Sequence, residues 1–141
     1  MSNDARVVWK KGLSFTGTGL TSSFSVPIGA DPKAGGENDG FRPTELVLVA
    51  LAGCTAMDVI SILTKKRQQV TSFEVRTHGE RAEQEPRAFT SFSVEYVVTG
   101  KGVDPAAVER AVELSETKYC SVMATLRGAG PVTRTITVQE A

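Results

Sequence analysis

The first part of the chain alternates apolar and polar residues over short stretches, with the period of two that is typical of β-strands. Two such stretches cover residues 13–16 and 22–26, and they follow a wholly apolar run at 7–9 that also predicts a strand. The short turns between them favour an antiparallel meander. We expect the aromatic side chains of these strands to lie in the core, namely Trp9, Phe15 and Phe24.

The pattern changes in the middle of the chain, where residues 46–63 are apolar on almost every side and include one charged residue, Asp58. A glycine-rich loop over 29–42 precedes this segment, and Pro43 is placed to open a helix that runs to about Arg67. The segment approaches the length of a membrane span. However, Asp58 and the slightly negative mean hydropathy of the chain favour a soluble protein without a membrane partner. Because a helix that is apolar all round must be covered on every side, we expect a partner subunit against it.

The remainder of the chain returns to strand patterns and adds two shorter helices. Strands are predicted over 72–77 and 89–98, with a polar connection between them. Asp104 followed by Pro105 has the form of a helix start, and a third helix is predicted over 121–126. A last strand over 132–138 closes the chain. The pattern therefore predicts an α+β protein.

Length and charge limit the classes of function. A chain of 141 residues with 40% apolar side chains suffices for one core, so we expect a single domain over 1–141. Sixteen basic and 16 acidic residues cancel, which leaves no electrostatic footprint for nucleic acid. The first residues lack an apolar signal segment, so a cytoplasmic location is expected, where a structural disulfide is uncommon. The single histidine, His78, is expected in an exposed turn, and with two distant cysteines it makes a poor metal site.

Two cysteines, Cys54 and Cys120, are the strongest nucleophiles of the chain. From the residues alone they are either small buried apolar side chains or a pair that cycles between dithiol and disulfide. Asp58 lies one helical turn after Cys54, and its charge opposes formation of the thiolate. Cys120 stands at the start of the predicted third helix, where unpaired amides and the helix dipole favour a negative charge.

The segments Pro-Thr-Glu-Leu at 43–46 and Ala-Leu-Ala-Gly-Cys-Thr-Ala-Met-Asp at 50–58, with Cys120 before a later helix, together resemble the OsmC/Ohr family of osmotically inducible and organic-hydroperoxide-resistance proteins. The resemblance implies an α+β fold that forms an intertwined homodimer, with antiparallel sheets around two long central helices. It also implies a cysteine-based peroxidase of the stress response that reduces organic hydroperoxides without metal or prosthetic group. Cys54 would attack the peroxide and become a sulfenic acid, and Cys120 would condense with it to a disulfide.

The resemblance further implies an external dithiol as reductant and an apolar substrate pocket beside Met57, Val59 and Met123. Family peroxidases place an arginine of the N-terminal strands beside the thiolate, whereas this chain has Lys-Lys-Gly-Leu at 10–13. Arg42 is the nearest alternative cation. The position that matches the family carboxylate holding this arginine is Thr44, and Glu45 stands one residue later. On its own helix Glu45 lies about half a turn away from Cys54, so it could serve a site across a dimer interface.

These departures resemble the less characterised OsmC-like branch of the family. They leave a second hypothesis, in which the chain is a non-catalytic OsmC-like dimer that binds a small apolar ligand.

Overall fold

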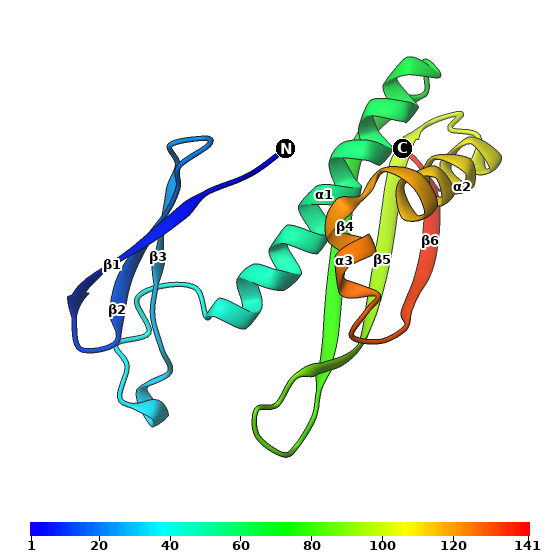
Figure 1. Ribbon diagram of the computed structural model, residues 1–141. Helices are drawn as coiled ribbons and strands as arrows, with labels where there is room; N and C mark the ends of the chain where they lie inside the picture. The colour runs from blue at the N-terminus through cyan, green and yellow to red at the C-terminus, as the bar shows by residue number, and fades with distance from the viewer. The chain divides into compact units, whose positions relative to one another are not determined.

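Three short antiparallel strands form the N-terminal sheet of the computed structural model, which describes residues 1–141 (Figure 1). They are β1 (Ala5–Lys11), β2 (Ser14–Gly19) and β3 (Ser25–Ile28), hydrogen-bonded in the order β1-β2-β3. The predicted meander is therefore confirmed. The sheet belongs to a compact unit over 1–47, and residues 48–141 form a second unit. The single domain expected from the length stays a prediction.

The aromatic residues of this sheet are less buried than expected. Trp9 is 63% exposed and Phe24 is 80% exposed, and Phe15 is partly buried. The placement of Trp9 and Phe24 in the core was therefore wrong for the chain alone. The physical reason is that the unit has no second layer packed on this sheet, so strand alternation does not produce burial there.

The loop over 29–42 is tied down by hydrogen bonds. Asp31 caps a 3₁₀ turn, Pro32–Ala34, by accepting a hydrogen bond from the amide of Lys33. Farther along, the amide of Phe41 donates to the carbonyl of Pro27 at 2.9 Å, and the buried Ser14 hydroxyl donates to Asp39 at 2.7 Å. The loop thus returns to the sheet before helix α1 begins.

Helix α1 (Pro43–Lys65) is the long helix predicted from the apolar segment. Its fully buried residues are Leu51, Thr55, Val59 and Leu63, which recur every fourth position and form one narrow stripe. The remaining apolar positions are only partly covered, and Met57 is 69% exposed. α1 is long and apolar enough to cross a membrane. The core helix of a soluble protein also meets these criteria of length and composition.

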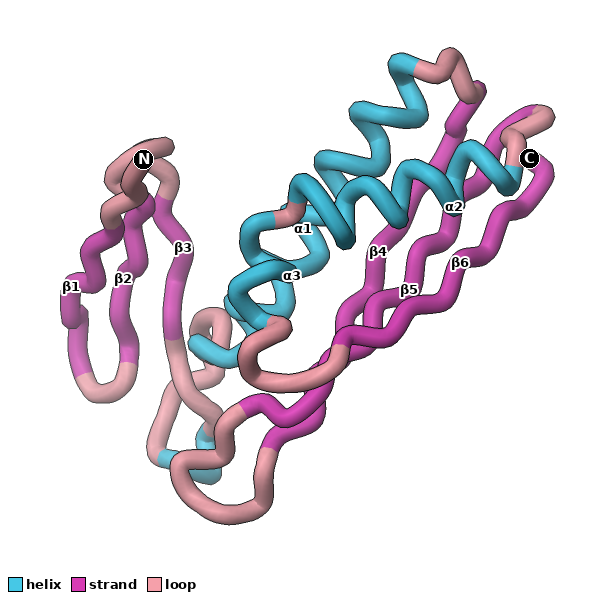
Figure 2. The backbone as a smooth tube through the Cα atoms, turned by 45° about the vertical axis from the view of Figure 1, so that its right-hand side comes forward, coloured by secondary structure: helices cyan, strands magenta, loops and turns pink.

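A second sheet and three helical segments complete residues 48–141. Strands β4 (Gln69–Arg81), β5 (Phe89–Lys101) and β6 (Val132–Glu140) are hydrogen-bonded in the order β4-β5-β6. Between β5 and β6 come α2 (Pro105–Leu114), a π-helical turn (Ser115–Tyr119) and α3 (Ser121–Leu126). The helices cover one face of the sheet (Figure 2). Every second residue of the central strand β5 is buried against them, namely Phe92, Val94, Tyr96 and Val98.

The sheet is mixed, which corrects the expectation of antiparallel sheets. β4 pairs with β5 antiparallel, but β5 pairs with β6 parallel, with Tyr96 opposite Ile136. A parallel pair needs a crossover connection, and α2, the π-helical turn and α3 provide it. The predicted start of α2 is confirmed, since Asp104 accepts a hydrogen bond from the amide of Ala106 at 3.0 Å. The partner subunit and its second long helix stay predictions.

Candidate functional site

The two cysteines meet within residues 48–141, although they are far apart in the sequence. Cys54 comes from the middle of α1, and Cys120 is the residue that caps the N-terminus of α3. Both are free thiols, and the Cys54 side chain is near enough to Cys120 to raise the pKa of its thiol. Cys54 is partly exposed, whereas Cys120 is 3% exposed. The structure thus brings together the two thiols that the sequence analysis proposed as a redox pair.

The surroundings of Cys120 favour its neutral form. Its Sγ accepts a hydrogen bond from the amide of Met123 at 3.4 Å, which is the helix-start contact expected from the sequence. Burial nevertheless raises the pKa of the Cys120 thiol to about 12, with further contributions from the Cys54 side chain and from the charge of Asp58. The expectation that the helix start favours the thiolate was therefore wrong in its net effect, because one amide does not compensate for the lost solvation.

A buried network of hydroxyl groups lies beside the thiols. Thr55, Tyr96 and Ser115 are all fully buried. The Oγ1 atom of Thr55 lies 2.8 Å from the hydroxyl of Tyr96 and 2.8 Å from that of Ser115. The Ser115 hydroxyl donates to Oδ2 of Asp58 at 2.8 Å. One network therefore joins α1, β5 and the π-helical turn, and it ends on the carboxylate that follows Cys54 by one turn.

At the Tyr96 end of this network lies an ion pair between Glu116 and Arg134. The Tyr96 hydroxyl lies 3.5 Å from Oε1 of Glu116, and Arg134 of β6 pairs with the other oxygen of Glu116 at 2.6 Å. Burial raises the pKa of Tyr96 well above its ordinary value, and Glu116 adds to this effect. Tyr96 is therefore a neutral hydrogen-bond donor at any physiological pH.

Two small pockets adjoin the two thiols and the hydroxyl network. One, of about 250 Å³, is lined by Asp58, Ser61, Ile62, Lys65 and Tyr119. The other, of about 180 Å³, is lined by Cys120 together with residues of the π-helical turn and α3, and it includes two cations, Lys118 and Arg127. Nothing in the sequence pattern indicated these cations.

The expected apolar pocket beside Met57, Val59 and Met123 is not formed by these residues. Val59 and Met123 have no exposed surface, and Met57 is largely exposed. The reason is that Val59 lies on the stripe of α1 that packs into the core, while Met57 lies two positions away on a different side of the helix.

Arg42 and Glu45, the other two predicted site residues, lie in the unit over 1–47. The backbone amide of Arg42 donates to Oε1 of Glu45 at 3.0 Å. The Arg42 guanidinium donates to the side chain of Asn38 at 2.7 Å and to the carbonyl of Gly40 at 3.0 Å. Arg42 and Glu45 are thus neighbours at the start of α1, and their catalytic roles stay predictions.

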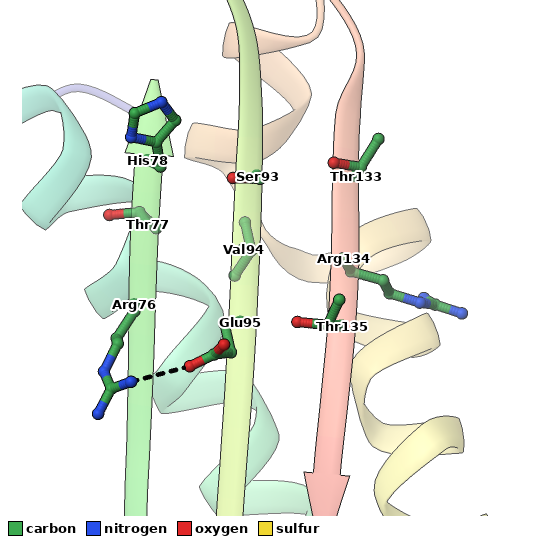
Figure 3. A pocket seen from close by; sticks show the side chains of 9 residues that line it. All are labelled: Arg76, Thr77, His78, Ser93, Val94, Glu95, Thr133, Arg134 and Thr135. Atoms are coloured by element: carbon green, nitrogen blue, oxygen red, sulfur yellow. Dashed lines mark hydrogen bonds and ion pairs between the residues drawn. The ribbon is translucent and has the colours of Figure 1, made fainter. Parts of the chain in front are cut away.

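A third pocket, of about 300 Å³, is lined by residues of the second sheet, including Arg76, His78, Glu95, Thr133 and Thr135 (Figure 3). His78 lies within β4 rather than in a turn, because β4 continues to Arg81. It is exposed and contacts Glu80 at 2.7 Å. No group of three or more His, Cys, Asp or Glu side chains is placed to hold a metal ion.

Comparison with known proteins gives consistent matches over most of the chain. Residues 36–135 match the family model described as OsmC-like protein. Protein YhfA of Escherichia coli strain K12 is 43% identical over 134 residues, which are 95% of this chain and 96% of YhfA. The crystal structure of a hypothetical protein from Aquifex aeolicus has a TM-score of 0.86 at 28% identity, covering 100% of this chain and 98% of the other. The organic hydroperoxide resistance protein OhrB of Bacillus subtilis has a TM-score of 0.63 at 17% identity, covering 96% and 98%.

Proposed function

Because this chain belongs to the OsmC-like family, we propose that it is a thiol-dependent peroxidase that reduces organic hydroperoxides through Cys54 and Cys120. The observation that carries the proposal is the proximity of two free thiols from distant parts of the sequence, close enough for Cys54 to affect the pKa of Cys120. The likeness in fold to OhrB of Bacillus subtilis, an organic hydroperoxide resistance protein, supports the class of substrate.

The proposed cycle has three steps. The thiolate of Cys54 attacks a peroxide oxygen, so that the O–O bond breaks, an alcohol leaves after protonation, and Cys54 becomes a sulfenic acid. The Cys120 thiol then attacks the Cys54 sulfur, which forms a disulfide and releases water. An external dithiol reduces this disulfide by exchange and is itself oxidised. Such a cycle belongs in a compartment that keeps dithiols reduced, which is the cytoplasm.

Exposure and charge support this assignment of roles. Cys54 is the more accessible sulfur, as the group that meets the peroxide must be. Cys120 is buried and protonated, which suits a thiol that reacts only after its partner has been oxidised.

The proposed peroxidase is tested with purified protein, cumene hydroperoxide and a dithiol donor. We expect the native chain to consume the peroxide and Cys54→Ser to consume none. Cys120→Ser should form a sulfenic acid at Cys54 that a dimedone probe captures. Ser93→Ala, on the second sheet, is the matched control and should retain full activity. Equal turnover by the native chain and Cys54→Ser would refute the proposal.

Arg42 is proposed as the cation that stabilises the Cys54 thiolate, with Glu45 as the carboxylate that orients it. Removing the positive charge in Arg42→Ala should slow alkylation of Cys54 by iodoacetamide at neutral pH, by about tenfold, because less of the thiol is ionised. Arg110→Ala, an exposed arginine of α2 paired with Glu113, is the control. An unchanged alkylation rate in Arg42→Ala would remove Arg42 and Glu45 from the proposed site.

A second candidate function is a dimer that binds a small apolar ligand without catalysis. Asp58 favours it, because a carboxylate one helical turn after Cys54 opposes ionisation of the Cys54 thiol. The same alkylation experiment separates the two functions. Ordinary reactivity at Cys54, together with no peroxide consumption, would support the binding protein.

A further inference from the structure

The hydrogen bonds of the buried hydroxyl network all have the same donor-to-acceptor direction. Each hydroxyl has one hydrogen to donate, and an ionised carboxylate can only accept. Ser115 uses its hydrogen on Asp58, so the hydrogen between Thr55 and Ser115 must come from Thr55. The hydrogen between Tyr96 and Thr55 at 2.8 Å must then come from Tyr96, which leaves its longer 3.5 Å contact with Glu116 without a hydrogen of its own. Three buried donors therefore point in sequence toward Asp58.

Asp58 is held close to both cysteines by two independent connections. On α1 it follows Cys54 by four residues, which places both side chains on the same side of the helix. Through Ser115 it is tied to Cys120, because the Ser115 carbonyl accepts the amide of Cys120 at 2.8 Å while the Ser115 side chain donates to Asp58. The carboxylate is only partly buried and lines the pocket that contains Lys65, so it has a route to solvent.

We propose that Asp58 accepts the proton of the Cys120 thiol when that thiol attacks oxidised Cys54, and that Ser115, Thr55 and Tyr96 are positioning residues that aim the carboxylate. The inference deepens the proposed peroxidase function and rests on it. In the step, the Cys120 sulfur bonds to the Cys54 sulfur and its proton moves to Asp58. The S–O bond of the sulfenic acid breaks, and the departing hydroxide takes the proton from Asp58 to form water. The Cys120 sulfur is oxidised and the Cys54 sulfur is reduced.

The site needs such a proton acceptor. With the pKa of Cys120 raised to about 12, only about one thiol in 10⁵ is ionised at neutral pH. The other groups that face the cluster are poor candidates. Tyr96 is a neutral donor, and Glu116 is paired with Arg134. Lys65 beside Asp58, and Lys118 and Arg127 in the pocket of Cys120, are cations. Tyr119 lines the pocket beside Asp58, but its hydroxyl already carries a hydrogen, so it is a poor proton acceptor. Asp58 is the carboxylate that remains.

The test is the rate of disulfide formation in Asp58→Asn after one equivalent of peroxide. Asparagine still accepts the hydrogen bond from Ser115 but is not a base. We expect disulfide formation to slow roughly a hundredfold at neutral pH, with sulfenic acid accumulating at Cys54. The rate in the variant should rise about tenfold per pH unit, because hydroxide must replace the carboxylate, whereas the native rate stays nearly flat around neutral pH. Asp104→Asn makes the same change of charge far from the thiols and keeps its helix cap, so it should behave as the native chain.

A second assay works without peroxide and so separates this inference from the proposed function. In a Cys54→Ser background, the reaction of Cys120 with dithiodipyridine, an uncharged disulfide, is followed with and without Asp58→Asn. A proton acceptor predicts a slower reaction when Asp58 is replaced. A carboxylate that acts only as a negative charge predicts a faster one, because its loss makes the thiolate easier to form.

A faster or unchanged reaction in this assay overturns the role of Asp58, whatever the peroxidase assay gives. If Asp58→Asn does not fold, Ser115→Ala provides the same comparison. It removes the donor that aims the carboxylate, and a several-fold slower reaction with a steeper pH dependence is expected. A native rate and pH dependence in folded Ser115→Ala would contradict the positioning role.

Discussion

At the scale of single residues, Cys120 shows how burial outweighs a favourable local contact. It receives one backbone hydrogen bond at the start of α3, yet its thiol is almost completely enclosed. Burial removes the solvation energy of the thiolate charge, and a hydrogen bond from one amide restores only part of that energy. Its resting state is consequently a protonated thiol beside Cys54.

The raised pKa of Cys120 predicts a loss of stability at alkaline pH. The pKa rises from an ordinary value of 9.0 to about 12 in the folded chain, so the unfolded chain loses this proton first. The stabilisation is complete below pH 9 and is lost as the pH rises toward 12, by at most about 1.4 kcal/mol per pH unit. Urea unfolding of the reduced protein at increasing pH measures this slope. Cys120→Ser should show a smaller slope, and equal slopes would contradict the assignment.

At the scale of elements, α1 has more apolar surface than its own chain covers. Its fully buried stripe is one residue per turn, and exposed apolar side chains remain at Val49 and Met57. Trp9, Phe24 and others on the first sheet are exposed as well. Exposed apolar side chains on each of these elements are typical of a protein interface. It supports the proposed homodimer, in which a second copy of α1 would supply the missing cover.

The homodimer predicts a mass of twice the 15.0 kDa chain in sedimentation equilibrium. Met57→Lys places a charge on the exposed apolar side of α1 and should shift the protein toward the monomer mass, with at least a tenfold weaker association. Thr64→Lys adds the same charge near the end of the helix, where the chain is already polar, and should leave the mass unchanged. A native chain that sediments as a monomer would exclude the dimer.

At the scale of the whole molecule, the order and type of nearly all elements could be predicted from the sequence. Period-two alternation gave the strands, and Pro43 and Asp104-Pro105 marked helix starts that the structure has. These signals are local, so they survive without knowledge of the fold. The family resemblance, confirmed by the match over 36–135, supplied the pairing of the cysteines.

What the sequence did not reveal depends on contacts between distant positions. Thr55 reaches Tyr96 and Ser115 across separations of 41 and 60 residues, and no local pattern marks such a network. The parallel pairing of β5 and β6 was missed for the same reason, since a strand pattern specifies its faces but not the direction of its neighbour. Burial of the first sheet was overestimated because alternation predicts a covered face without saying which molecule covers it.

The crossover between β5 and β6 also has a consequence during synthesis of the protein. Cys54 leaves the ribosome long before Cys120, and Cys120 lies within the connection that precedes the final strand. Their meeting requires that connection to dock on a sheet whose third member is translated last. A nascent chain therefore presents Cys54 to the solvent before Cys120 is able to pack beside it.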